Sequence, residues 1–283
     1  MRVLAGREVP LGGERALTVR RTLPHRERRT IGAWCFLDGY GPAPARMHVP
    51  PHPHTGLQTV SWLFSGDVLH RDSIGSEQPI APGELNIMTS GRGIAHSEHS
   101  VGDAQLQGLQ LWAALPDLDR FQEPHFEHHG DLPRVDRDGF DAIVVVGGFA
   151  GVESPAVTYT RLLGVELTVR SSCRVGLRDD FEHGLLAVDP VTVDDQRLEA
   201  GEMAYLPPGT TSARVAGDGL CFLIGGAPFT EPLVMWWNFV GRDHDEIVAD
   251  RIDWQAGARF GVVPGGEPAL PAPPMPTTRL SPR

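Results

Sequence analysis

Residues 47–66, MHVPPHPHTGLQTVSWLFSG, contain two histidines, His52 and His54, that are separated by a single residue. Residues with this spacing point to the same side of an extended strand. The alternation in the following LQTVSWLF indicates a strand. If this strand extends back through the histidines, both imidazoles lie on the face of Gln58 and Val60. The stretch therefore predicts two imidazoles on one face of a β-sheet.

A second pair follows in IAHSEHS, where His96 and Glu98 have the same spacing. Two paired strands of one small barrel can bring both pairs together at its inner wall. Three imidazoles and one carboxylate suit a borderline divalent ion, at bond lengths of about 2.0–2.2 Å. A lone HxH or HxE is usually a surface or hydrogen-bonded pair. Two face-matched pairs together favour a metal site with open positions for substrate or O2.

Short apolar segments alternate with Gly, Pro, Asp and Asn along the chain, and helical periodicity is almost absent before residue 240. This pattern predicts an all-β protein, either an antiparallel sandwich or a barrel, or two such units in tandem. The matching segments GELNIMTSG (83–91) and GEMAYLPPG (201–209) favour a duplicated unit. We expect an N-terminal metal-binding barrel over residues 1–120, a connector over 121–140, a metal-free C-terminal barrel over 141–235, and a helix with a Pro-rich tail over 236–283.

The segment GRDHDEIVADRIDWQAG (241–257) predicts the one helix. Asp243 is its expected N-cap, and its expected apolar side is Ile247, Ile252 and Trp254. The Pro-rich residues from Pro264 onward predict an extended or poorly ordered tail.

Composition excludes several classes of protein. A net charge of −11 argues against a nucleic-acid partner held by phosphate contacts. No apolar run approaches the roughly 20 residues of a membrane span, and the N-terminal residues predict no signal peptide. Three distant cysteines, Cys35, Cys173 and Cys221, predict reduced thiols. We therefore expect a soluble, cytoplasmic protein.

The remaining histidines lack a comparable pattern. His125, His128 and His129 lie in the charged connector, where solvated side chains are expected. The sequence shows no comparable partner set for His25, His70, His99, His183 and His244.

HPHTGLQTVSWLFSG followed by PGELNIMTSGRGIAHSE resembles the signature of the pirin family, which are bicupins of the cupin superfamily. FLDGYGPA, LQGLQLWAALP and EPLVMWWNFVGRDHDEI occur in the family's order, so the resemblance covers most of residues 20–255. It implies two stacked β-barrels with one iron in the N-terminal barrel. By position, it implies the ligands His52, His54, His96 and Glu98.

The resemblance implies Fe(II), although Mn, Ni, Cu or Zn would suit the same donors. Gln58 stands where many pirins have a glutamate, and Gly39 where a histidine is common. We expect both changes to alter the surroundings of the metal and not to abolish its binding. In the second barrel, the ligand positions correspond to Gly176, Arg178 and Ser212, with Glu182 nearby, so no metal is expected there.

The resemblance further implies an oxidoreductase of the quercetin 2,3-dioxygenase (quercetinase) type, which opens a flavonol or related enediol with O2. Glu98 is then the candidate to accept the proton of the substrate hydroxyl. An alternative is a regulatory protein without turnover, which binds transcription factors or metabolic enzymes according to its metal or redox state. The acidic surface favours protein partners over DNA for such a regulator. A sugar-binding or isomerase cupin is a third alternative.

Overall fold

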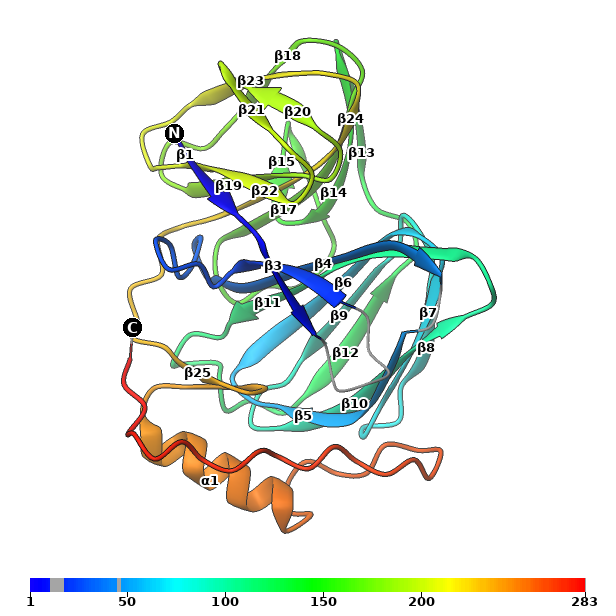
Figure 1. The fold of residues 1–283 in the computed structure, drawn as a ribbon, viewed down its shortest axis with the longest axis vertical. Helices are drawn as coiled ribbons and strands as arrows, with labels where there is room; N and C mark the ends of the chain where they lie inside the picture. The colour runs from blue at the N-terminus through cyan, green and yellow to red at the C-terminus, as the bar shows by residue number, and fades with distance from the viewer. Residues whose placement is uncertain (11–17, 45–46, 283) are drawn as a thin grey trace. The chain divides into compact units, whose positions relative to one another are not determined.

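The computed structural model describes residues 1–10, 18–44 and 47–282, and its chain forms two compact units (Figure 1). The first unit contains Met1–Val9, Arg20–Gly39 and His129–Phe229; the second contains Pro10–Val19, Tyr40–His128 and Thr230–Arg283. Each unit thus combines segments that are distant in the sequence, unlike the contiguous division that the sequence predicts. No helix within the described residues is long and apolar enough to cross a membrane.

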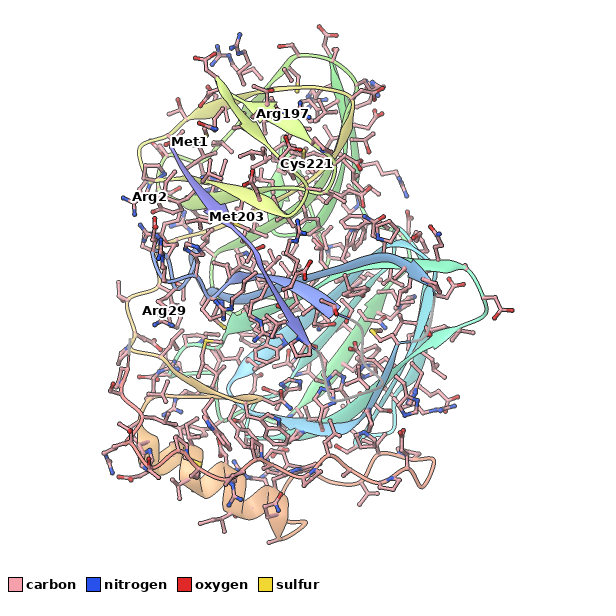
Figure 2. The ribbon with its side chains drawn as sticks, viewed as in Figure 1. Met1, Arg2, Arg29, Arg197, Met203 and Cys221 are labelled. Atoms are coloured by element: carbon pink, nitrogen blue, oxygen red, sulfur yellow. The ribbon has the colours of Figure 1, made fainter. Side chains whose placement is uncertain are left out.

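The first unit is built from short strands: β1 (Arg2–Ala5), β13 (Arg134–Arg137), β14 (Phe140–Val146), β15 (Gly148–Phe149), β16 (Val152–Glu153), β17 (Leu162–Val169), β18 (Cys173–Gly176), β19 (Glu182–Ala187), β20 (Val191–Val193), β21 (Gln196–Leu198), β22 (Glu202–Leu206), β23 (Ser212–Ala216) and β24 (Gly219–Gly226). Its larger sheet has the order β1-β22-β19-β24-β17-β14-β13, and a smaller sheet has the order β18-β23-β20-β21. Inward-facing apolar residues of both sheets, among them Val144, Val165 and Leu223, form one core. Cys221 belongs to this core (Figure 2), and all three cysteines are buried thiols that form no disulfide.

The second unit contains β5 (His48–His54), β6 (Leu57–Ser65), β7 (Asp67–Asp72), β8 (Glu77–Ile80), β9 (Leu85–Thr89), β10 (Ile94–Val101), β11 (Gln105–Ala114), β25 (Val234–Trp236), β26 (Phe239–Gly241) and α1 (His244–Gln255). Four of the sequence boundaries between the two units fall inside strands, which are β2 (Arg7–Pro10), β3 (Thr18–Leu23), β4 (Trp34–Pro44) and β12 (His125–His129). One sheet has the order β5-β10-β7-β8, and in the larger sheet β12, β9, β6, β11 and β4 are successive neighbours. The candidate site lies on the first of these two sheets.

The prediction of an all-β fold with a short C-terminal helix is confirmed. Asp243 caps α1 as predicted, since its side chain accepts a hydrogen bond from the Glu246 N–H. The predicted apolar side of this helix is wrong at Ile252, which is 57% exposed, whereas Ile247 is buried. Residues 256–282, which follow α1, have no regular secondary structure, but Leu270 N donates to Pro51 O on β5 at 2.8 Å.

Two local expectations are also wrong. The region 121–140 is not merely a connector, because it contains β12 and β13. The histidine strand does not continue into LQTVSWLF: β5 ends at His54 and β6 begins at Leu57 in another sheet. Gly56 makes this corner with a φ of +68°, and a Cβ there would lie 2.1 Å from Val240 O. The corner therefore needs glycine.

Candidate metal centre

The two histidine-bearing strands face each other directly. In the β5–β10 pair, His52 is opposite His96 and His54 is opposite Ile94, so these side chains point to the same side of the sheet. The register then shifts: three steps along β5, from His52 to Val49, match two steps along β10, from His96 to Glu98. This is a β-bulge on β5.

Two consecutive prolines, Pro50 and Pro51, occupy the bulge. They have no N–H group to donate to the ladder, so a bulge suits them better than regular pairing. The irregular backbone turns the Pro50 carbonyl towards the neighbouring imidazole, and His52 Nδ1 lies 2.9 Å from Pro50 O. The prolines thus help to position the first histidine.

Strand β7 adds two side chains on the other side of β10. Its register places Asp72 opposite His96 and His70 opposite Glu98. Both residues are almost completely buried. His70, His96 and Glu98 each offer a ligand atom within 4.8 Å of the others. The expectation that His70 has no partner set is therefore wrong.

Three imidazoles converge where the sequence predicts them. His52, His54 and His96 offer ring nitrogens within 4.8 Å of one another, and their ring centroids are 4.4–5.0 Å apart. His54 and His96 are each 1% exposed, whereas His52 is 8% and Glu98 7% exposed. The accessible side of the cluster is therefore at His52 and Glu98.

Hydrogen bonds fix which nitrogen of each ring carries the proton. His52 Nδ1 faces Pro50 O, and His54 Nδ1 is 3.1 Å from Asn238 O. A carbonyl oxygen can only accept, so both Nδ1 atoms are protonated. In the neutral rings, both Nε2 atoms then carry free lone pairs, as a metal ligand must.

The third ring, His96, is placed in the same tautomer by His70 and Asp72. His70 Nε2 lies 3.1 Å from Asp72 Oδ2, and His70 Nδ1 lies 3.3 Å from His96 Nδ1. The pKa of Asp72 is lowered, because hydrogen bonds from His70 and Ser76 outweigh its burial. The ionised carboxylate makes His70 Nε2 the donor. With Nε2 as the donor, His70 Nδ1 can accept from His96 Nδ1–H, which leaves His96 Nε2 without a proton.

A buried atom without a partner tests whether a metal fits here. Among the described side chains, His96 Nε2 is one of the buried polar atoms without a hydrogen-bond partner. Such an atom costs about 1–3 kcal/mol. A divalent ion would satisfy it, together with the free Nε2 atoms of His52 and His54, so the residues fit a metal. Their identification as ligands remains a prediction.

Burial sets the protonation of the cluster. It lowers the pKa of His52 to about 4, and it lowers the pKa of both His54 and His96 well below the usual value, with His52 adding repulsion. These rings are neutral at physiological pH. Burial raises the pKa of Glu98, although a hydrogen bond from Ser61 Oγ at 3.0 Å opposes it. Glu98 is thus a carboxylate that takes up a proton easily.

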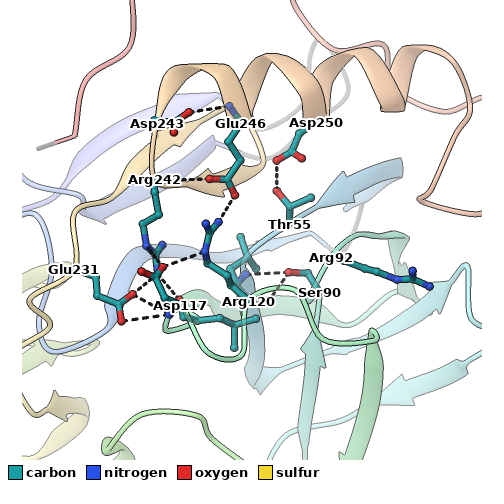
Figure 3. Close-up of polar contacts among 12 residues, drawn as sticks. Thr55, Ser90, Arg92, Asp117, Arg120, Glu231, Arg242, Asp243, Glu246 and Asp250 are labelled. Atoms are coloured by element: carbon teal, nitrogen blue, oxygen red, sulfur yellow. Dashed lines mark hydrogen bonds and ion pairs between the residues drawn. The ribbon is translucent and has the colours of Figure 1, made fainter.

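The C-terminal segment of this unit supports β5. Thr55, which follows His54 in the sequence, donates a hydrogen bond of 2.7 Å to Asp250 on α1. Figure 3 marks this contact with a dashed line. Ser90 Oγ accepts from Leu57 N at 2.9 Å and donates to Leu57 O at 2.7 Å. These contacts fix both ends of the corner at Gly56. Neither these hydrogen bonds nor the contact between His54 and the Asn238 carbonyl could be predicted from the sequence, because in each case the two residues are distant along the chain.

The other predicted positions have different surroundings. Gln58 donates to Thr89 Oγ1 at 2.9 Å. In the first unit, Glu182 accepts from Arg28, the Gly32 N–H and Tyr205 at 2.9–3.0 Å. His128, which was expected to be solvated, is half-buried, with Nδ1 2.8 Å from Asn86 Oδ1.

His70 and Asp72 were not predicted from the sequence as residues of the centre. They could have been identified, since DVLHRDS carries the same i, i+2 spacing as the two predicted ligand pairs.

Comparisons with known proteins decide the family. Residues 16–113 match the Pirin family model, and residues 162–261 match the model of the pirin C-terminal cupin domain. The chain belongs to the pirin family. The predicted bicupin fold is thereby confirmed, with the candidate centre within the first matched segment.

Individual pirin-family relatives align along nearly the whole chain. A Pseudomonas aeruginosa protein named "Putative quercetin 2,3-dioxygenase" is 42% identical over 96% of this chain and 90% of its own. A pirin-like protein of Caulobacter vibrioides is 35% identical over 84% of this chain and 88% of its own. A crystal structure of quercetin 2,3-dioxygenase from Acinetobacter baumannii superposes with a TM-score of 0.94 and 38% identity, and covers 99% of this chain and 97% of the other.

Proposed function

We propose that this pirin-family protein is a mononuclear metal dioxygenase that opens flavonol-like or enediol substrates with O2. The observation that carries the proposal is the set of three histidines with Nδ1 engaged and Nε2 free, next to a buried glutamate. The relatives named for quercetin 2,3-dioxygenase activity support this substrate class. We propose Fe(II) as the metal.

The proposed ligands are His52, His54, His96 and Glu98. Bound there, the metal would supply redox chemistry and positions for oxygen ligands. The protein holds three neutral imidazoles in fixed tautomers and leaves access beside His52 and Glu98. Glu98 accepts the proton of the substrate hydroxyl, because its pKa is raised by burial and its Oε1 is oriented by Ser61.

Metal content tests the ligand assignment. We expect His54→Ala and His96→Ala to remove most of the bound metal, measured by elemental analysis after anaerobic purification, while circular dichroism shows a folded protein. His25→Ala, which removes a histidine of the first unit, is the control and should retain the metal. Full metal content in both His54 and His96 variants would contradict the assignment.

Oxygen uptake tests the chemistry. With the iron-loaded protein, we expect O2 consumption with flavonols or other enediols. Glu98→Gln should keep part of the metal and lose turnover, whereas Glu77→Gln, an exposed control on β8, should behave as wild type. An iron-loaded wild type that consumes no O2 with any such substrate would contradict the proposed activity. That result would favour a regulator that uses the metal without turnover.

A further inference from the structure

A second group of metal-ligating side chains lies outside the candidate centre. His48 on β5, His99 on β10 and Glu267 in the segment after α1 each offer a ligand atom within 4.8 Å of the others. The two imidazole rings are 4.5 Å apart between centroids, with planes at 82°. His99 Nε2 is 3.4 Å from Glu267 Oε2, and His48 Nε2 contacts Oε1 of the same carboxylate.

The bulge in β5 creates this group. By simple alternation, His48 would share the face of His52 and His54, because all three have even numbers. The one-residue register shift at Pro50 and Pro51 reverses the alternation, so that His48 pairs with His99 on the opposite face. His48 accordingly has a side chain that is 49% exposed. The same two strands thus carry histidines on both of their faces.

Backbone hydrogen bonds hold the chain next to Glu267 in place. Leu270, three residues after Glu267, donates its N–H to Pro51 O on β5 and accepts from Trp254 Nε1 of α1, both at 2.8 Å. A cavity of about 290 Å³ is lined in part by Pro51, Trp254, Glu267 and Leu270. The segment that carries Glu267 is therefore not closely packed against β5 and α1 at this point. Direct pairs between exposed side chains contribute only about 0–1 kcal/mol.

We propose that His48, His99 and Glu267 form a second divalent-metal site, which takes a borderline ion such as Zn²⁺ and fastens the C-terminal segment to β5 and β10. Two imidazoles and one carboxylate are a donor set for zinc and similar ions, with solvent completing the coordination. The nearby Arg71 is paired with Glu77 at 3.1 Å, which offsets its charge. An ion here would bond to all three side chains at once.

Zinc stoichiometry tests the proposal. Protein whose inner centre already holds one equivalent of metal is dialysed against graded ZnCl2 and analysed for total metal. We expect wild type to take up one further equivalent, and His48→Ala and Glu267→Gln to bind it at least tenfold more weakly. His25→Ala should bind as wild type. No further equivalent in wild type, or the same uptake in both variants, which would indicate an adventitious ion only, overturns the proposal.

Amide hydrogen exchange tests the fastening separately from the binding. Zinc should slow exchange of the Leu270 amide, which is bonded to Pro51 O, in wild type but not in Glu267→Gln. Equal exchange with and without zinc in wild type would overturn the fastening role. The titration needs the inner centre to be filled beforehand, but neither measurement depends on dioxygenase turnover, so failure of the second site and failure of the proposed dioxygenase activity are distinguishable.

Discussion

Asp72→Asn tests whether a chain of hydrogen bonds prepares the third histidine for metal binding. Asp72 Oδ1 accepts from the backbone N–H groups of Ile74 and Ser76 at 3.1 and 2.9 Å, and Oδ2 accepts from His70. An asparagine must keep its oxygen towards the two backbone donors. Its NH2 group then faces His70 Nε2, which becomes an acceptor.

That exchange moves protons along the whole chain. His70 then carries its proton on Nδ1 and donates to His96 Nδ1, so the proton of His96 moves to Nε2, the proposed ligand atom. Metal binding has to reverse this arrangement, which breaks the hydrogen bond between the new amide and His70 Nε2 and leaves two buried N–H donors facing each other, at a cost of about 1–3 kcal/mol. We therefore expect the dissociation constant of the metal to rise about tenfold to a hundredfold.

The assay is competition with a metal-sensitive fluorescent chelator at pH 7.5. Asp67→Asn, at an exposed position of the same strand, is the matched control and should bind as wild type. The ¹⁵N shifts of the metal-free protein should show the His96 tautomer changing in Asp72→Asn. Unchanged affinity together with an unchanged tautomer would refute the reasoning, whatever the turnover of the variant.

Two further predictions concern stability. Burial holds the pKa of His52 at about 4, below its ordinary 6.5, so between these values the unfolded chain binds a proton that the folded chain does not. His52 should contribute fully to the stability of the metal-free protein above pH 6.5, and the loss of its contribution alone should lower stability by roughly 3 kcal/mol towards pH 4, beside the losses from His54 and His96; urea midpoints that depend on pH equally in His52→Gln would contradict this. Gly91→Ala should cost more than about 2 kcal/mol, because its Cβ would lie 2.1 Å from Gln122 O at a φ of +49°. Gly102→Ala, also at positive φ but with nothing within 4 Å, is the control, and equal melting temperatures for the two variants would refute the steric explanation.

Local sequence was sufficient for several elements. The i, i+2 spacing of His52 with His54, and of His96 with Glu98, placed each pair on one strand face because the strand repeat is set by the backbone alone. Asp243 correctly predicted the start of α1, since N-capping depends only on the residues of the first turn. The all-β class likewise followed from short apolar segments between turn residues.

Other features required the closed structure. Continuous alternation from His52 to Gln58 was wrong, because the chain changes sheet at Gly56, where Val240 approaches from a distant segment. Ile252 looked apolar and buried by helical spacing, but it is exposed. Periodicity identifies a face and does not reveal what, if anything, covers it.

The sequence by itself determined which side chains share a strand face, and thus which could meet around one ion. The tertiary structure alone decided how those side chains are protonated and oriented. His54 is fixed by the carbonyl of Asn238, 184 residues away, and His96 by His70 and Asp72 on the neighbouring strand. The physical reason is that strand alternation is a local property of the backbone, whereas a hydrogen bond to a ring nitrogen depends on which distant segment the closed sheet brings beside it.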